Sequence, residues 1–156
     1  MNNRLTTHGR WRPNATVATV VEREGRFLMV EELDRDTGLI VVNQPAGHLE
    51  AGETLVEAAE REVLEETGWQ VTVNSYLGVA RLQAVNGVTY LRHTFVAQPC
   101  HEISHPHLDE GIIAARWMTY EELRACQSKH RSPLVMQVVE LFIQGVQAPL
   151  SLVLDA

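Results

Sequence analysis

The stretch from Gly47 to Trp69 constrains this chain more than any other, because it joins a glycine-containing loop to an acidic helix. Thr54 and Glu57 have the spacing of a capping box, in which each side chain accepts a hydrogen bond from a backbone N–H of the first helical turn. Gly68 supplies a residue that readily adopts the left-handed conformation ending many helices. The pattern therefore predicts a helix over residues 55–67.

Three glutamates of this helix lie beside its apolar side, whereas glutamates that serve only solubility would lie opposite that side. At about 100° per residue, the apolar residues fall on one arc that must pack on the core, namely Leu55, Val56, Ala59 and Val63. Glu62, Glu65 and Glu66 overlap and border that arc. Half-burying neighbouring carboxylates is costly, and like charges at these spacings repel each other. A divalent cation such as Mg²⁺, which binds carboxylate oxygens, would remove both penalties.

The same residues complete a known motif, G-x5-E-x7-R-E-U-x-E-E-x-G-U, through Gly47, Glu53, Arg61, Glu62, Val63, Glu65, Glu66, Gly68 and Trp69. The chain thus resembles the Nudix hydrolase family. If each of seven fixed identities occurs by chance roughly one time in fifteen, an accidental match is on the order of one in 10^8. This disfavours the alternative of a solvated acidic helix. Residues 43–50 and 131–134 further resemble the phosphatase NudJ subgroup, and this similarity extends from Trp11 onward.

The resemblance implies a fold and an activity. The expected fold is the α/β class, as a Nudix α/β/α sandwich with a mixed sheet. The expected activity is metal-dependent hydrolysis of phosphoanhydride bonds in nucleoside di- and triphosphates and related small organic pyrophosphates, including thiamine-type pyrophosphates. Mg²⁺ is the expected cofactor, with Mn²⁺ as a substitute. The alternatives are an ADP-sugar or dinucleotide pyrophosphatase and, outside enzymes, a Nudix-like nucleotide-binding sensor, which a complete motif disfavours.

The resemblance also assigns roles within the motif. Glu62 and Glu66 are implied metal ligands, Glu65 adds a ligand or a water contact, and the carbonyl group of Gly47 joins them. Glu62 is the candidate catalytic base, and Glu65 stays in the catalytic set because family members differ in which glutamate deprotonates the water. Arg61 and Glu53 complete that set as a pair that holds the loop against the helix. The alternative is a surface ion pair of Arg61 with Glu57.

Residues outside the motif give further candidates. We expect Glu110 to be an additional metal ligand, with a simple loop carboxylate as the alternative. Arg92 and Tyr90 are predicted to contact a phosphate or a base of the substrate, although a solvent-facing strand arginine is equally compatible. Gln44 and Ser132 are predicted substrate contacts only through the subgroup resemblance.

The histidine-rich run from Cys100 to His107 and the two cysteines offer a second place for metal binding. The run could bind a soft metal, but its irregular spacing and Pro106 favour a solvated loop. Cys100 and Cys126 form no C-x-x-C pair, so we expect free thiols instead of a zinc site or a disulfide.

Length and charge set the remaining expectations. We expect a flexible N-terminal arm over residues 1–10 and a single domain over residues 11–156. A net charge of -7 argues against non-specific binding of nucleic acid. No signal-peptide core or membrane span is visible, so no membrane partner and a cytoplasmic location are expected. The expected partner is a small-molecule di- or triphosphate substrate, and the expected state is a monomer or a homodimer.

Periodicity and turn residues predict the other elements. Glu24-Gly25 and Asn86-Gly87 mark two hairpin turns. Ser132 and Pro133 are predicted to be the N-cap and first residue of a late helix with an apolar face that includes Leu134, Val138, Leu141 and Phe142. The last segment is expected to add a weak strand. The predicted strands cover residues 15–21, 27–31, 39–43, 69–81, 88–97 and 112–119, and the helices cover residues 120–126 and 133–143.

Overall fold

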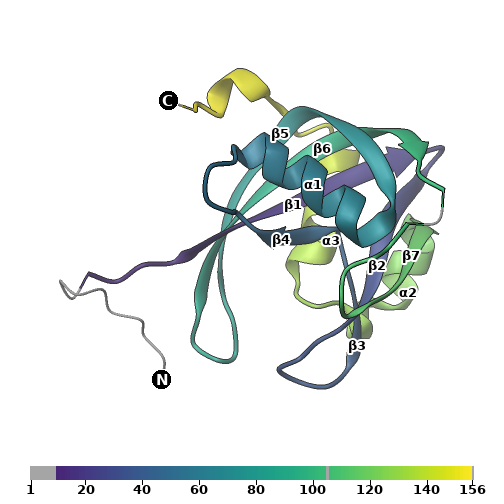
Figure 1. Ribbon diagram of the computed structural model, residues 1–156. Coiled ribbons are helices and arrows are strands. Elements are labelled where there is room, and N and C mark those ends of the chain that lie inside the picture. Colours follow the sequence, from purple (N-terminus) through teal and green to yellow (C-terminus); the bar gives the residue numbers. More distant parts are fainter. Residues whose placement is uncertain (1–9, 105, 156) are drawn as a thin grey trace.

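A mixed β-sheet with helices on both faces forms the protein (Figure 1). The computed structural model describes residues 10–104 and 106–155. Helix α1 (Leu55–Thr67) covers one face, whereas α2 (Tyr120–Ala125) and α3 (Leu134–Ile143) cover the other. The expected α/β fold with a mixed sheet is confirmed. The predicted flexible arm lies, apart from Arg10, outside the described residues.

The sheet has the strand order β3-β2-β1-β6-β5-β8, with β4 paired to β1 and β7 paired to β2. Strands β1 and β6 are parallel, and the other pairs are antiparallel. This arrangement brings β4, which leads into the loop before α1, against the central strand β1. The strands are β1 (Asn14–Arg23), β2 (Arg26–Leu33), β3 (Ile40–Asn43), β4 (Ala46–His48), β5 (Trp69–Gln83), β6 (Thr89–Glu102), β7 (Ile112–Thr119) and β8 (Ala148–Pro149).

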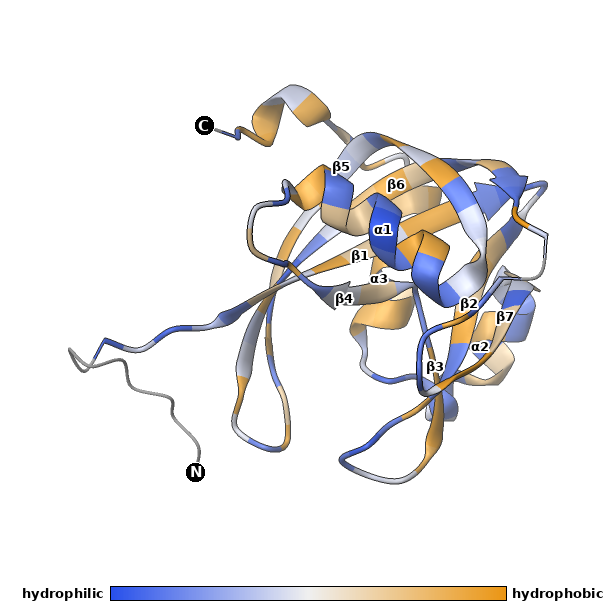
Figure 2. Ribbon diagram, viewed as in Figure 1, coloured by the Kyte–Doolittle hydropathy of each residue, from blue (hydrophilic) through white to orange (hydrophobic). Residues whose placement is uncertain are grey.

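Two apolar clusters hold the helices to the sheet. Under α1, Ala59 and Val63 pack with Val17, Val21 and Phe95 of the central strands. On the opposite face, the buried residues of α2 and α3 pack against β1 and β2. Figure 2 shows the resulting contrast between the largely apolar α3 and the hydrophilic residues on the outer side of α1. No helix of the described residues is both long and apolar enough to cross a membrane.

The ends of α1 are confirmed where the sequence predicts them. The side chain of Thr54 accepts a hydrogen bond from the backbone N–H of Glu57, and the Glu57 side chain accepts one from the backbone N–H of Thr54. Gly68 has a φ angle of 74° and donates its N–H to the carbonyl oxygen of Leu64. Local capping therefore fixes where the glutamates of α1 begin and end.

Helix α3 differs from its prediction at the N-terminus. It begins at Leu134, and Pro133 occupies the N-cap position without a side-chain hydrogen bond. The hydroxyl group of Ser132 does not cap the helix, so that prediction is wrong. The buried residues of α3 are Val135, Met136, Val138 and Val139. Of the predicted face, Val138 is buried and Phe142 packs on the core, whereas Leu141 is exposed. Because apolar residues occupy almost every position of α3, periodicity alone does not determine which side of this helix is buried.

Candidate active site

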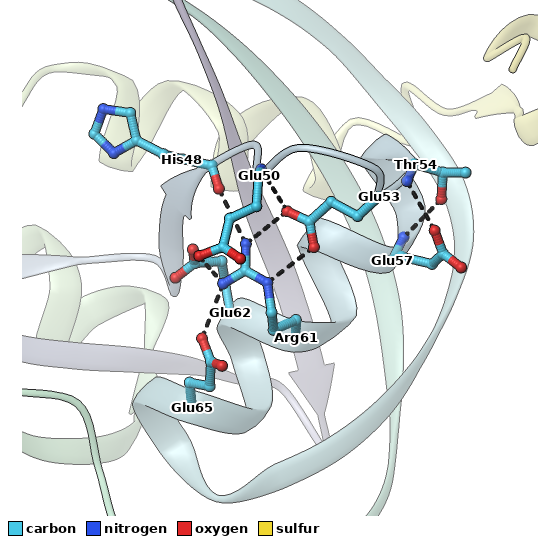
Figure 3. A network of polar contacts seen from close by, with 8 residues as sticks. All are labelled: His48, Glu50, Glu53, Thr54, Glu57, Arg61, Glu62 and Glu65. Carbon is cyan, nitrogen blue, oxygen red and sulfur yellow. Dashed lines mark hydrogen bonds and ion pairs between the residues drawn. The ribbon is translucent and has the colours of Figure 1, made fainter.

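Arg61 connects the loop before α1 to the acidic side of that helix (Figure 3). Its Nε and Nη2 atoms donate to the two carboxylate oxygens of Glu53, at 2.9 and 2.7 Å. Nη2 also donates to the carbonyl oxygen of His48 at 3.0 Å, while Nη1 donates to Glu62 at 2.8 Å and to Glu65 at 2.9 Å. The contact between Arg61 and Glu53 that the resemblance implies is therefore present.

This contact changes the electrostatics of both partners. The guanidinium group of Arg61 lowers the pKa of Glu53, and the neighbouring carboxylates raise the pKa of Arg61. Glu57, the alternative partner, instead uses its carboxylate in the capping box with Thr54. Arg61 is thus a permanent cation that orients Glu62 and Glu65 as well as the loop.

Glu62 lies directly against Gly47. A Cβ atom built at Gly47 would collide with the carboxylate group of Glu62, so only glycine leaves room for this approach. Glu62 is 7% exposed, and burial raises its pKa, although the hydrogen bond from Arg61 opposes this effect. A buried carboxylate is thereby held next to the backbone of β4.

Glu66 lies one helical turn further along the same side of α1. It is also 7% exposed, and its Oε2 atom accepts a hydrogen bond from the backbone N–H of Ala46 at 2.9 Å. Burial raises the pKa of Glu66 to about 9, although this hydrogen bond opposes the increase. Nearby Glu32, Glu62 and Asp109 raise it further by electrostatic repulsion.

The segment before β7 brings a further acidic residue, Asp109, next to Glu65 of α1. Glu62, Glu65 and Asp109 each offer a carboxylate oxygen, and these three atoms lie within 4.8 Å of one another. The backbone N–H of Asp109 donates to the carbonyl oxygen of Glu65 at 3.0 Å, which fixes the segment before β7 against the helix. Oxygen atoms in this arrangement are suitable ligands for a hard divalent cation.

Glu110, the predicted additional metal ligand, is not a member of this three-residue cluster. Its side chain is 93% exposed and lies 3.4 Å from Arg35, although it lines a pocket together with Glu66 and Asp109. Asp109 is the carboxylate that sequence reasoning missed. The adjacent pair Asp109-Glu110 was a usable signal, but the choice between them depends on the contact of Asp109 with Glu65.

A cavity of about 480 Å³ lies on the other side of β4 and contains most of the predicted substrate contacts. Ala46, Gly47 and His48 form one wall, and Tyr90, Arg92 and Ser132 also line it. The rings of His48 and Tyr90 meet edge to face, with their centroids 5.9 Å apart. The cavity therefore combines aromatic surface with polar groups.

Arg92 lies in this cavity with only 5% of its surface exposed, which excludes the alternative of a solvent-facing strand arginine. Its Nη1 and Nη2 atoms donate to Asn43 Oδ1 at 3.2 and 3.3 Å, and Nη2 also donates to Gln44 Oε1 at 3.0 Å. Burial lowers the pKa of Arg92 to about 10, so it is still a cation at neutral pH.

Gln44 and Ser132 differ in their access to a ligand. Gln44 is 1% exposed, and its amide group is used by Arg92 and by the carbonyl oxygen of Val135, at 2.8 Å. Gln44 thus holds Arg92 through a hydrogen bond, and its contact with substrate stays a prediction. Ser132 lines the cavity, and its buried Oγ atom has no hydrogen-bond partner among the described residues.

The cysteines and the histidine-rich run add no further cluster in the described ranges. Cys100 and Cys126 are free thiols, as expected. Within residues 10–104 and 106–155, the group with metal-ligand spacing consists of Glu62, Glu65 and Asp109. It contains no histidine or cysteine. Cys100, His101 and Glu102 lie in strand β6, so the predicted loop covers only the later part of the run, and His105 lies outside the described residues.

Comparison with known proteins agrees with this geometry. Residues 10–138 match the model of the NUDIX domain. Proteins named phosphatase NudJ from Escherichia coli K12 and Shigella flexneri are 40% identical to this chain over 148 residues, covering 93% of each sequence. A solved NUDIX hydrolase from Nitrosomonas europaea is 44% identical, with a TM-score of 0.89 over 93% of this chain and 98% of its own.

The sheet, the loop and the acidic helix thus define a Nudix phosphohydrolase, and the chain belongs to the NUDIX family. Within that family, it is similar to the phosphatase NudJ proteins over nearly its whole length. Nudix hydrolases act on small phosphorylated substrates and generally use divalent metal ions, and the acidic cluster on α1 is suited to such an ion.

Proposed function

We propose that this enzyme hydrolyses phosphoanhydride bonds in nucleoside di- and triphosphates and in related small organic pyrophosphates, with Mg²⁺ as its cofactor. Mn²⁺ is the expected substitute, and thiamine-type pyrophosphates belong to the same substrate class. The observation that carries this proposal is the pair of buried carboxylates, Glu62 and Glu66, on the side of α1 that faces β4. The names of the NudJ relatives support phosphatase activity.

The buried carboxylates fit a divalent cation on physical grounds. Burial raises the pKa values of Glu62 and Glu66, because each ionised form has lost much of its hydration. A cation would stabilise both ionised forms. Glu65 would add a more accessible oxygen, and the carbonyl group of Gly47 would complete the side next to β4. Glu110 is the less suitable additional ligand, since Asp109 lies closer to this group.

When bound, the metal ion neutralises phosphate charge and lowers the pKa of a coordinated water. The chain itself performs the remaining tasks. Glu62 accepts a proton from the attacking water, with Glu65 as the alternative base. Arg61 and Glu53 hold the loop and the helix in a fixed relative position. The contact between Gly47 and Glu62 then keeps the base beside the reacting phosphate.

The cavity beyond β4 holds the rest of the substrate. Its volume of about 480 Å³ lies within the usual range for small-molecule sites, roughly 300–1,000 Å³. Tyr90 offers an aromatic ring to an organic group, while Arg92 and Ser132 offer hydrogen-bond donors. Because the acidic helix would bind the diphosphate that all these substrates share, we expect broad recognition of nucleotides.

Hydrolysis of an ADP-sugar or a dinucleotide is the competing function, because the motif on α1 is common to both reactions. A nucleotide-binding sensor is disfavoured by the complete set of glutamates and by the match to hydrolases. These alternatives differ in substrate and in turnover. They are therefore separable in one assay.

We expect similar kcat/KM values for adenine, guanine, cytosine and uracil di- and triphosphates in the presence of Mg²⁺. A pocket without dedicated base contacts discriminates by only about 10–200-fold, whereas one built to hydrogen-bond a single base can reach about 10^4-fold. The assay should include ADP-ribose and thiamine pyrophosphate and should resolve phosphate from pyrophosphate. A preference above about 10^3-fold for one base, or rapid cleavage of ADP-ribose with inert nucleotides, would reject the proposal.

A further inference from the structure

Arg92 is a buried cation whose direct hydrogen bonds go to neutral groups. Its terminal nitrogens donate to the amide oxygens of Asn43 and Gln44, and both of these acceptors are neutral. In the part of the chain that the structure describes, no carboxylate forms an ion pair with it. A buried charge normally needs a counter-charge, so these contacts alone do not explain a purely structural arginine.

Two acidic side chains, Glu32 and Glu66, act on Arg92 electrostatically, and each has another partner. Glu66 accepts a hydrogen bond from the backbone N–H of Ala46. Glu32 affects Arg92 electrostatically, but its Oε1 atom accepts from Asn43 Nδ2 at 3.1 Å and its Oε2 atom lies 3.0 Å from Arg131. Arg131 lines the same cavity, yet it is neutralised by this contact. Of these two arginines, Arg92 is therefore the one left to meet an incoming anion.

The surrounding amides determine the direction of the guanidinium group. Asn43 turns its Nδ2 atom to Glu32 and its Oδ1 atom to Arg92. Gln44 turns its Nε2 atom to the carbonyl oxygen of Val135 and its Oε1 atom to Arg92. The two amide oxygens orient the cation without cancelling its charge, and they leave the Nε atom without an acceptor.

A second polar atom without a hydrogen-bond partner belongs to a residue of the same cavity. The buried Oγ atom of Ser132 has no hydrogen-bond partner, which makes it and the Nε atom of Arg92 the two such side-chain atoms among the described residues. Both residues line the cavity wall. Buried polar atoms are nearly always hydrogen-bonded. Two that lack a partner, on residues that line one cavity, therefore indicate that a ligand supplies the missing hydrogen bonds.

We propose that Arg92 and Ser132 bind a phosphate group of the substrate, next to the phosphate that is cleaved at the acidic side of α1, and that Asn43 and Gln44 position Arg92 for this task. The inference rests on the proposed function and specifies how it recognises substrates. A planar guanidinium group matches the geometry and the charge of a phosphate, whereas a carbonyl group of a neutral base would leave the buried charge uncompensated.

The position of β4 allows one polyphosphate to meet both groups. Ala46 and Gly47 line the cavity, while Ala46 also donates to Glu66 and Gly47 lies against Glu62. Glu32, Asp34 and Arg131 line both this cavity and the pocket that Glu66 and Asp109 line, so the two adjoin each other. Successive phosphates of one substrate can contact the acidic cluster and Arg92, and the organic group then lies towards Tyr90.

The test uses a probe that has phosphates but no base. A methylene-bridged analogue of inorganic triphosphate is suitable, because its P–C–P bridges cannot be hydrolysed. In the presence of Mg²⁺, we expect its inhibition constant to rise about tenfold or more in Arg92→Gln, the scale of a lost hydrogen bond to a charged group. Arg92→Lys should lie between this variant and the wild type, and inhibition by free uridine or adenosine should not change.

The matched control is Arg116→Gln, which removes an arginine that pairs with Glu31 outside the cavity lining. It should leave the inhibition constant unchanged. A second variant, Gln44→Glu, keeps Arg92 and places a carboxylate beside it. This variant should weaken the same probe, because the new ion pair neutralises the cation, and it keeps the test valid if Arg92→Gln fails to fold.

An unchanged inhibition constant in Arg92→Gln or, if that variant does not fold, in Gln44→Glu would overturn the inference. Loss of nucleoside inhibition with intact binding of the phosphate probe would overturn it too, because Arg92 would then recognise the base. Turnover of nucleotides by the wild type is read separately in the same assay. Failure of the proposed function is therefore distinguishable from failure of this phosphate contact.

Discussion

Gly47 determines how closely the proposed catalytic base, Glu62, can approach the backbone of β4. Its lack of a side chain lets the carboxylate group of Glu62 pack against β4. The backbone of Gly47 does not need a positive φ angle, unlike the other described glycines. An added methyl group would therefore act through its collision with Glu62 and not through backbone strain.

We expect Gly47→Ala to lower kcat by about 100-fold, because displacement of a reacting group by about 1 Å can cost that much. Stability should change little, since the end of the Glu62 side chain can move aside. Steady-state kinetics and thermal unfolding measure the two effects. The double variant Gly47→Ala/Glu62→Gln should be no slower than Glu62→Gln alone, and an additive loss would show that Gly47 acts through another residue.

Glu66 makes the metal-free protein sensitive to pH. Its pKa is raised from 4.5 to about 9 in the folded state, so the folded protein binds more protons than the unfolded chain between these values. The contribution of Glu66 to stability is fully present below about pH 4.5 and is lost as the pH rises towards 9. Glu62, whose pKa is also raised, acts in the same direction.

We therefore expect the free energy of unfolding, measured by urea denaturation with a chelator, to fall from pH 5 to pH 9 more steeply in the wild type than in Glu66→Gln. Mg²⁺ should bind more tightly over the same range, since binding requires ionised carboxylates. Parallel pH profiles for the two proteins would contradict the assigned environment of Glu66.

At the scale of elements, the C-terminus of α1 connects helix stability to the position of Asp109. Gly68 adopts a φ angle of 74°, and a Cβ atom there would lie 2.6 Å from Cβ of Pro106. Three residues beyond Pro106, the N–H of Asp109 donates to the carbonyl oxygen of Glu65. A side chain at position 68 would therefore strain the helix end and push against this segment.

We expect Gly68→Ala to destabilise the protein by about 1–2 kcal/mol, the usual cost of a left-handed conformation for a residue other than glycine. It should also weaken Mg²⁺ binding through displacement of Asp109. Urea denaturation and metal titration measure these effects. Gly87→Ala, in the β5–β6 turn, is the control, because it has a φ angle of 83° and no neighbour within 4 Å. It should lose stability without weaker metal binding.

The elements also explain which features the sequence can predict. The ends of α1 depend on Thr54, Glu57 and Gly68, all local to the helix, and they were predicted correctly. The proximity of Asp109 to α1 depends on a hydrogen bond with Glu65, which is more than forty residues away in the sequence. Hydrophobic periodicity predicts local elements and does not predict such long-range contacts. The same applies to Arg92, which was predicted to contact substrate but not to be held by Asn43 and Gln44.

For the whole molecule, metal binding should stabilise the fold by mass action, because the glutamate cluster exists only in the folded state. Saturating Mg²⁺, at about 100 times its dissociation constant, corresponds to about 2.7 kcal/mol and should raise the melting temperature. The increase should vanish in Glu62→Gln/Glu66→Gln. An undiminished increase in that double variant would locate the metal site elsewhere, with residues 101–107 as the first region to test.

The most direct test of the account is the rate of nucleotide hydrolysis by Glu66→Gln at saturating Mg²⁺, measured beside its metal-free melting temperature. The amide keeps the side-chain shape and can still accept from the N–H of Ala46, but it removes a buried acid. We expect kcat to fall by about 100-fold or more, the scale of a lost electrostatic contact in an active site. The metal-free melting temperature should equal or exceed that of the wild type. A destabilised variant that retains most of its hydrolytic rate would contradict a metal-binding role for Glu66 in catalysis.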